Sequence, residues 1–320
     1  MLTLAGERIS IIIPCFNAER WLAQAIRSAL EQTLPPAEVV VVDDGSTDSS
    51  AEAARSFGSL VHYVRQAKRG SCAARNFGLS IASGRLIQYL DADDLLHKRR
   101  FELLIEAWRA APDAQFAASG YRSYRSTEID DREISEGDLA IRAPRILRNV
   151  LAVNYLPVAG LFRKSFLESI GPWNESLTRW VDLEFHSRIA AHSRTPIPFV
   201  DLPLYGYRQH DGSRISSQNR NQTNLDAALC ALSAAEAHFK TGGEIGGSDK
   251  SYFFPMYVQL ARGYAKAGER EKFLRMLERA AFLSPRASFR FKAHAARAFS
   301  RLFGVRAVSN VLERVLPPMQ

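Results

Sequence analysis

The chain has 320 residues, of which 46% are hydrophobic and 24% are charged, a composition typical of a soluble globular protein with one large or two smaller domains. No stretch approaches the roughly 18 to 20 uninterrupted apolar residues of a membrane-spanning helix. The first ten residues lack the basic and apolar regions of a signal peptide, so we expect a cytoplasmic protein. The cysteines are odd in number and far apart, which predicts free thiols rather than disulfides or a zinc site: Cys15, Cys72 and Cys230.

The net charge of +8 is unevenly distributed along the chain. From Arg262 to Gln320 there are thirteen basic residues and four acidic ones, so this stretch carries the whole excess. A nucleic-acid-binding protein spreads basic charge over its recognition surface, and we therefore expect no nucleic-acid partner. The distribution suggests instead an anionic surface that one end of the molecule meets.

In the first hundred residues, short apolar runs alternate with segments of helical period. The apolar runs predict strands at 8–13, 38–42, 60–64 and 85–90, and the segments between them predict helices within 18–33, 46–57 and 70–84. Strands without polar alternation are buried on both faces, and intervening helices allow parallel pairing. The prediction is an α/β fold with a doubly wound, mostly parallel sheet and helices on both faces.

The rest of the chain changes character twice. Residues 105–215 predict a mixed region with a strand pair in 114–124, a charged loop at 125–138 and a helix at 179–193. Residues 219–320 read as helices with a flexible linker at 241–250. We therefore expect a first domain at 1–218, with halves at 1–105 and 106–218, and a helical extension at 219–320.

Polar residues follow three of the predicted strands: "PCFN" at 14–17, "DDGSTD" at 43–48 and "DADD" at 91–94. Ligands bind beyond the carboxyl ends of the strands in such sheets, so these residues are expected to converge on one edge. The first loop has no G-x-G-x-x-G, which argues against a dinucleotide-binding Rossmann domain. A nucleotide site of another kind is indicated.

The acids at these strand ends leave alternatives open. Asp91, Asp93 and Asp94 suit a hard divalent cation such as Mg²⁺ or Mn²⁺, whose charge would offset their mutual repulsion and whose shell substrate phosphates often complete. Asp93 or Asp94 could instead cap a helix. Asp43 and Asp44 either form a strand-to-helix turn capped by Ser46 or Thr47, or divide the work, one holding the loop and the other binding a base or ribose.

Four segments in this order and spacing closely resemble the family 2 inverting glycosyltransferases, which have the GT-A fold: "ISIIIPCFNAERWLAQAIRSALEQT", "VVVVDDGSTD", "KRGSCAARNFGLSIASGRLIQYLDADD" and "WVDLEFHSRI". The likeness covers roughly residues 8–215. It implies a metal-dependent transfer of a sugar from a nucleotide-sugar donor, expected to be UDP-linked, to a hydroxyl of a glycan or lipid-linked acceptor. The product would be a bacterial-type surface or secreted glycan.

The resemblance also implies roles for single residues in the donor site. Pro14, Phe16 and Asn17 would line the nucleotide pocket, although many relatives have Tyr or His in place of Phe16. The remaining donor-site residues would be Asp44 at the base, Arg75 near the nucleotide or diphosphate, Asp91 at the ribose or at metal-bound water, Asp93 as the principal ligand of Mn²⁺ or Mg²⁺, and, as weaker candidates, Lys68, Arg69 and Asn76.

By the same resemblance Asp182 falls on the general-base position, with Glu184 as the rival assignment. Relatives commonly have Glu-Asp where this chain has Val181-Asp182. The alternative is an exposed helical acid paired with a neighbouring arginine, Arg179 or Arg188. Residues 207–216 resemble the family's closing segment, in which Arg208 or His210 would reach the diphosphate or the metal; the alternative is a solvated loop.

The C-terminal region and the function each carry a further choice. Residues 257–285 resemble one tetratricopeptide-type hairpin turning at Gly268. The basic helix after it could contact a membrane at its inner face or pack on the protein itself, through an imperfect stripe of Phe289, Lys292, Ala293, Ala296 and Phe299 or Ser300. The rival functions are a sugar nucleotidyltransferase, whose Gly-rich phosphate loop this chain lacks, and a non-catalytic nucleotide-sugar-binding module.

Overall fold

The computed structural model describes residues 8–126, 130–137, 145–147, 157–193, 195–210, 222–239, 247–284, 289, 293–297 and 300. The chain forms two compact units. The first comprises Met1–Ser176 and His192–Gly212, and the second comprises Leu177–Ala191 and Ser213–Gln320. The predicted boundary at residue 218 lies outside the described residues. The segment before it, Leu177–Ala191, groups with the C-terminal helices, which the predicted division did not foresee.

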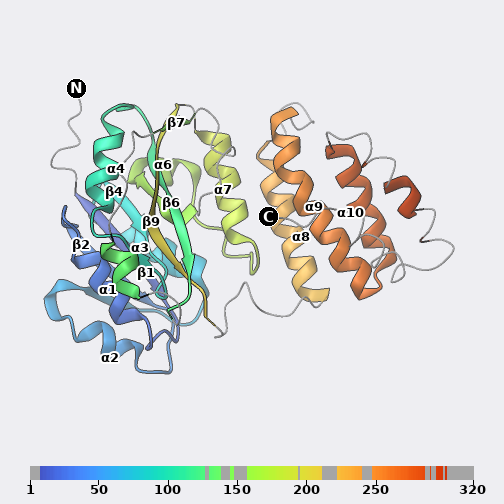
Figure 1. Cartoon of the computed structure of the whole chain (residues 1–320). Coiled ribbons are helices and arrows are strands. Elements are labelled where there is room, and N and C mark those ends of the chain that lie inside the picture. Colours follow the sequence, from blue (N-terminus) through green and yellow to red (C-terminus); the bar gives the residue numbers. More distant parts are fainter. Residues whose placement is uncertain are drawn as a thin grey trace. The chain divides into compact units, whose positions relative to one another are not determined.

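The described part of the first unit contains one mixed sheet of nine strands in the order β3-β2-β1-β4-β8-β6-β9-β5, with β7 paired to β9 (Figure 1). Its strands are β1 Ile9–Cys15, β2 Glu38–Asp43, β3 His62–Arg65, β4 Leu86–Tyr89, β5 Leu95–Leu96, β6 Phe116–Tyr124, β7 Arg145–Leu147, β8 Gly160–Arg163 and β9 Ile197–Arg208. The first four pair in parallel, which confirms the predicted core of the sheet. The predicted pair of strands in 114–124 is wrong, because β6 is one strand whose partners are the distant β8 and β9.

The helices of the first unit are α1 Leu22–Leu30, α2 Ser50–Arg55, α3 Ser71–Ile81, α4 Arg100–Trp108, α5 Asp131–Glu136 and α6 Lys164–Ile170. Crossovers between parallel strands are right-handed as a rule, and the chain reverses direction across the sheet after β3, so α1 and α2 lie over one face of the parallel strands and α3 over the other. The central strand β1 is accordingly buried along its whole length. The expected doubly wound sheet with helices on both faces is confirmed.

Helix α3 lies directly against the sheet. A Cβ atom at Gly78 would lie 2.4 Å from Cγ2 of Ile12 in β1, so only glycine permits this approach. Strand order reverses at β1, whose neighbours are β2 and β4. A ligand crevice is expected beyond the carboxyl ends of strands at such a reversal, and α3 lies at this part of the sheet.

The turn after β2 differs from its prediction. Ser46 or Thr47 was expected to cap the next helix, but α2 begins at Ser50 with Ser49 as its N-cap. The backbone N–H of Ser46 instead donates to the side chain of Asp43, and that of Thr47 donates to the side chain of Asn17. These four residues therefore shape a loop before the helix starts.

The second unit contains α7 Val181–His192, α8 Gln222–Ala237, α9 Gly247–Ala267 and α10 Arg270–Leu283. Gly268 has a left-handed φ of 83° between α9 and α10, as expected for the turn of a helical hairpin. Part of the predicted linker at 241–250 is helical, because α9 begins at Gly247. Phe289, Ala293 and Ala296 of the predicted stripe are buried in the core of this unit, and Ser300 is also buried, whereas Lys292 and Phe299 lie outside the described residues.

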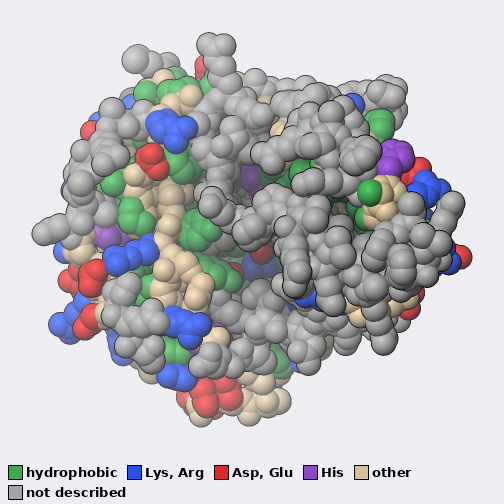
Figure 2. All heavy atoms as spheres, turned by 45° about the vertical axis from the view of Figure 1, so that its right-hand side comes forward, with side chains coloured by type: hydrophobic (Ala, Val, Ile, Leu, Met, Phe, Trp, Pro, Cys, Tyr) green, Lys and Arg blue, Asp and Glu red, His purple; other side chains and the backbone are tan. Residues whose placement is uncertain are grey.

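The described residues bear on three expectations from the sequence, which concern membrane-spanning helices, the cysteines and the distribution of charge. No helix among them has an apolar stretch long enough to cross a membrane. The cysteines are free, with Cys15 and Cys72 buried and Cys230 exposed. On the face drawn in Figure 2, acidic and basic side chains lie interspersed over the coloured part of the surface.

Candidate functional site

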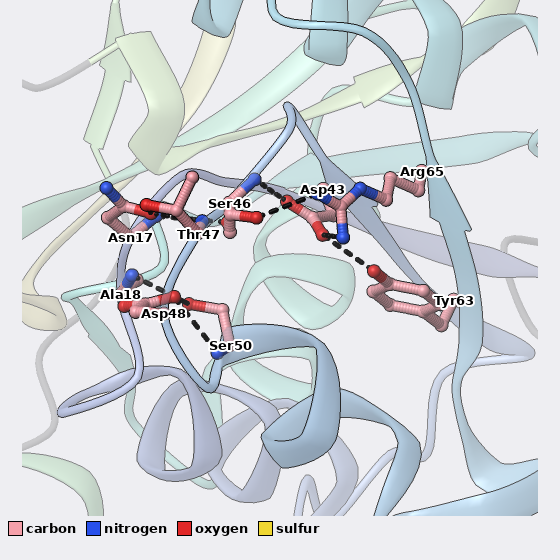
Figure 3. A network of polar contacts seen from close by, with 9 residues as sticks. All are labelled: Asn17, Ala18, Asp43, Ser46, Thr47, Asp48, Ser50, Tyr63 and Arg65. Atoms are coloured by element: carbon pink, nitrogen blue, oxygen red, sulfur yellow. Dashed lines mark hydrogen bonds and ion pairs between the residues drawn. The ribbon is translucent and has the colours of Figure 1, made fainter.

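The loops after β1 and β2 are joined by side-chain hydrogen bonds (Figure 3). Asn17 adopts a left-handed φ of 49°, a conformation that asparagine tolerates better than most residues. Its backbone N–H donates to Ser46 Oγ (3.0 Å), and its Oδ1 accepts from the backbone N–H of Thr47 (2.8 Å). The N–H of Ala18 donates to Ser50 Oγ (2.8 Å). The two loops therefore form one connected surface at this edge of the sheet.

Asp43 is fully buried at the end of β2. Its Oδ1 accepts from the backbone N–H of Ser46 (2.7 Å), and its Oδ2 accepts from the hydroxyl of Tyr63 (2.6 Å). Burial alone would raise the pKa of Asp43, but the hydrogen bonds from Ser46 and Tyr63 outweigh it, so that the pKa lies below the usual value. Asp43 is thus a charged brace of the loop.

Asp44, the predicted base contact, also holds a loop. Its Oδ1 accepts from Gln66 Nε2 (2.7 Å) and the N–H of Arg69 (2.8 Å), and its Oδ2 accepts from the N–H of Gly70 (2.7 Å). Asp43 and Asp44 therefore both accept hydrogen bonds from backbone N–H groups. The sequence had left open that one would hold the loop and the other would bind a ligand. Each carboxylate oxygen can accept two hydrogen bonds, so Oδ2 keeps the capacity for a ligand donor.

Phe16 presents an exposed aromatic ring beside these loops, with 40% of the residue accessible to solvent. The Nζ atom of Lys68 lies 3.7 Å from the centre of this ring. Pro14, two residues earlier, is buried at the end of β1. The edge thus offers a flat apolar surface and a cation, which together suit a base and a phosphate.

The turn after β4 separates acids that the sequence treated as a possible cluster. Asp91 Oδ1 accepts from Arg75 Nη2 at 2.7 Å, and Arg75 is itself buried. Asp93 Oδ2 lies 3.0 Å from His210 Nε2. Within the described part of the chain there is no group of three or more His, Cys, Asp or Glu side chains arranged to hold a metal ion. The predicted residues Asp93 and His210 are nevertheless brought together.

Asp94 and Arg208 stabilise the turn after β4 through buried hydrogen bonds. Asp94 is buried and its Oδ1 accepts from the backbone N–H of Arg208 (2.9 Å). The buried guanidinium of Arg208 donates to the carbonyl oxygen of Asp93 (2.8 Å), to Asp131 Oδ1 (2.8 Å) and to Gln24 Oε1 (2.8 Å). Arg208 or His210 was expected to reach the diphosphate or the metal, and the side chain of Arg208 is engaged inside the protein, where it fixes the turn that carries Asp93.

The two candidate bases lie on α7 in the second unit, and their environments differ. Asp182 is exposed in the first turn. Glu184 is buried between Arg188 Nη2 (2.8 Å) and His238 Nε2 (3.0 Å). Burial alone would raise the pKa of Glu184, but His238 and Arg188 outweigh it and lower the pKa. Asp182 and Asp93 belong to different units, so that their meeting in one site remains a prediction.

The sequence did not identify two residues of this edge, Gln66 and Trp21. Gln66 binds Asp44. Trp21 lies beside two predicted site residues, with ring centres 5.8 Å from His210 and its own ring 4.2 Å from the guanidinium carbon of Arg208. No local pattern marks either residue, because their partners come from distant parts of the chain. Residues 211–216 of the predicted closing segment lie outside the described residues.

Residues 10–171 match the family described as Glycosyl transferase family 2. The glycosyltransferase GlyG of Streptococcus pneumoniae serotype 4 is 32% identical over 226 residues, which cover 65% of this chain and 73% of GlyG. The glycosyltransferase GlyA of the same organism is 34% identical over 128 residues, and the match spans 39% of this chain but only 18% of GlyA.

Among solved structures, residues 1–349 of S. aureus TarS in complex with UDP-GlcNAc superpose with a TM-score of 0.68 at 16% identity. The match covers 98% of this chain and 93% of that one, and at this identity it shows the fold. The fold expected from the sequence, GT-A with a C-terminal helical region, is confirmed. The chain therefore belongs to the family 2 glycosyltransferases.

Proposed function

We propose that this glycosyltransferase moves a sugar from a UDP-linked donor to a hydroxyl of a glycan or lipid-linked acceptor, with inversion at the anomeric carbon. The observation that carries the proposal is the convergence, at the β1/β4 edge, of the Arg75–Asp91 pair and the Asp93–His210 pair (2.7 and 3.0 Å). The fold neighbour TarS was solved with UDP-GlcNAc, which makes a UDP-sugar the first donor to test.

In this proposal the nucleotide lies along the edge of the sheet formed by the segments that follow β1, β2 and β3. Pro14, Phe16 and Asn17 line its pocket, Asp44 Oδ2 accepts from the base, and Arg75 lies near the diphosphate. The exposed ring of Phe16 supports a stacked base, and its neighbour Lys68 supplies positive charge. Asp91 would face the ribose, because it is held at the surface by Arg75.

Mn²⁺ or Mg²⁺ is part of the proposal, with Asp93 and His210 as its protein ligands and Asp91 nearby. One carboxylate oxygen and one imidazole nitrogen fit a cation that completes its shell with diphosphate oxygens and water. Such a cation would neutralise charge on the leaving nucleoside diphosphate. The buried contacts of Arg208 keep the Asp93 turn in place for this purpose.

We assign the general base to Asp182 rather than Glu184. An exposed carboxylate can approach an acceptor hydroxyl, whereas Glu184 is buried between His238 and Arg188, whose hydrogen bonds hold its pKa low. Asp182 takes the proton as the hydroxyl attacks. General-base assistance is typically worth ~10²- to 10⁴-fold in rate.

The test offers a panel of nucleotide sugars with and without Mn²⁺ and follows nucleoside-diphosphate release. Asp182→Asn should lower kcat by ~10²- to 10⁴-fold while UDP still binds. Glu184→Gln is the matched control, since it should mainly reduce stability by breaking a buried ion pair. Activity with nucleoside triphosphates alone, with pyrophosphate formed, would indicate a nucleotidyltransferase. Donor binding without any transfer would indicate a non-catalytic binding module.

A cytoplasmic location, where nucleotide sugars are made, completes the proposal. Contact with the inner face of a membrane would have to come from the basic residues of the C-terminal region. The apolar residues Phe289, Ala293 and Ala296 are buried within the second unit. Sedimentation with anionic vesicles at low and high salt would test such contact.

A further inference from the structure

Trp173 follows α6 in the sequence and belongs to the first unit, and only 1% of it is accessible to solvent. The guanidinium carbon of Arg75 lies 4.6 Å from the centre of its ring. The ring also meets Tyr89 edge-on, with ring centres 5.6 Å apart and planes at 88°. Arg75 belongs to α3, and Tyr89 is the last residue of β4, two residues before Asp91. The indole therefore lies against the helix and the strand that supply the Arg75–Asp91 pair.

Asn76, the residue after Arg75, clamps this segment onto α3. The backbone N–H of Trp173 donates to Asn76 Oδ1 (2.8 Å), and Asn76 Nδ2 donates to the carbonyl oxygen of Trp173 (2.9 Å). One side chain thus binds both backbone polar groups of Trp173. Asn76 Nδ2 also donates to Glu175 Oε1 (3.0 Å), whose other oxygen accepts from Arg69 (2.8 Å).

We propose that Trp173 and Asn76 are positioning residues of the donor site, which hold the Arg75 guanidinium toward Asp91. This inference rests on the proposed function, in which Arg75 and Asp91 contact the nucleotide. Arg75 has a long side chain with many rotamers, and the Asp91 carboxylate that it meets is 31% exposed. An ion pair with one partner partly exposed to solvent is weak unless its geometry is fixed. The buried indole and the clamp fix it from the protein side.

A second buried tryptophan provides a matched control. Trp108 in α4 is fully buried, and the guanidinium carbon of Arg163 lies 5.2 Å from its ring centre. Arg163, however, donates to the carbonyl oxygens of Ala114 (3.0 Å) and Pro112 (2.8 Å), not to a donor-site acid. The two tryptophans therefore share burial and an arginine neighbour but differ in what that arginine binds.

The experiment titrates UDP into the full-length protein in the presence of Mn²⁺ and records the Tm of each variant. Trp173→Leu should raise the dissociation constant for UDP on the order of tenfold, because Arg75 is no longer held in place. Trp173→Phe should recover most of the affinity, since it keeps an aromatic face on the guanidinium. Trp108→Leu should lower the Tm comparably and leave the dissociation constant unchanged.

A double-mutant cycle tests whether the effect passes through Arg75. In an Arg75→Ala background, Trp173→Leu should change the UDP dissociation constant by less than about twofold. Asn76→Ala keeps the indole but releases the clamp, so it tests the same coupling if Trp173→Leu does not fold. Equal effects of Trp173→Leu and Trp108→Leu, or full additivity with Arg75→Ala, would overturn the inference. A wild type that binds no UDP at all would instead overturn the proposed function, and this inference with it.

Discussion

Two acidic turns of the first unit use their carboxylates in different ways. After β2, Asp43 and Asp44 accept hydrogen bonds from backbone N–H groups and are almost completely buried. After β4, Asp91 and Asp93 pair with the side chains of Arg75 and His210, and their own side chains remain 31% and 25% exposed.

This difference separates carboxylates that stabilise a loop from carboxylates that can bind a ligand. A carboxylate bound to backbone donors cannot exchange them without moving the chain, whereas one paired with a side chain at the surface can exchange that partner for a ligand. Asp94 shows that position in a motif does not decide the matter: it lies in the second turn, yet it is buried and binds the backbone N–H of Arg208. We therefore assign ribose and metal binding to the second turn, and mainly loop architecture to the first, in which Asp44 Oδ2 is the proposed contact to the base.

Among substitutions in these two turns, the largest expected effect comes from Asp93→Asn. Removing the charge that faces the cation should lower kcat by roughly 10²- to 10³-fold, since metal stabilisation of the leaving group is worth several kcal/mol. The Tm should change little, because a partly exposed contact between two polar side chains contributes only about 0–1 kcal/mol. Initial rates at saturating donor and Mn²⁺, together with thermal melts, measure both. If the Asp93→Asn variant loses stability but keeps kcat, the proposed difference between the turns after β2 and β4 is contradicted.

Asp43→Asn should do the opposite. It replaces a buried acceptor with an amide whose NH₂ group faces the Tyr63 hydroxyl or the Ser46 N–H, and leaving such a group unsatisfied costs about 1–3 kcal/mol. Urea unfolding measures the loss in free energy of unfolding. A large loss of kcat at unchanged stability would place Asp43 in the chemistry instead.

Stability should also fall at acidic pH through the first turn. Burial alone would raise the pKa of Asp43, but the bonds from Ser46 and Tyr63 outweigh it, so the folded-state pKa lies below the unfolded one. The resulting stability is complete above the unfolded value of about 3.9 and is lost as the pH falls through the folded value. Asp48 and Glu38, whose pKa values are also lowered, act in the same direction.

The Tm of the wild type should therefore decrease as the pH falls below about 5, and that of Asp43→Asn should decrease less steeply. Thermal melts in a series of acidic buffers make the comparison. Parallel curves for the two proteins would show that the Asp43 carboxylate is not held in its charged form by the fold.

An effect no larger than that of Asp43→Asn is expected at Asn17. Asn17→Ala removes the acceptor of the Thr47 N–H and places alanine at a left-handed φ of 49°, which together should cost about 1–3 kcal/mol. Asn17→Gly loses the same hydrogen bond but relieves the backbone strain, so it should be the more stable of the two. Equal stability of the variants in urea unfolding would show that the left-handed conformation is not maintained.

The sequence could predict the scaffold of this edge because its signals are local. Uninterrupted apolar runs identified β1, β2, β3 and β4 to within about two residues, and the parallel pairing follows from the helices between them. The partner of each acid could not be predicted in this way. His210 lies 117 residues after Asp93, and the Arg208 guanidinium is buried by residues from several distant elements.

The same limit applies to α7. Its helical period was readable, and the helix is present at Val181–His192. Its inclusion in the second unit depends on contacts far along the chain, such as that between Glu184 and His238, which are 54 residues apart. That contact also distinguishes the two candidate bases, which look equivalent in the motif itself.

The most direct measurement is a calorimetric titration of UDP into the wild type and Asp93→Asn, each with and without Mn²⁺. We expect Mn²⁺ to lower the dissociation constant of the wild type by at least about tenfold, a difference of about 1.4 kcal/mol, and to have little effect on the variant. Failure of the wild type to bind UDP, or an equal effect of Mn²⁺ on both proteins, would contradict a donor site built around the turn after β4.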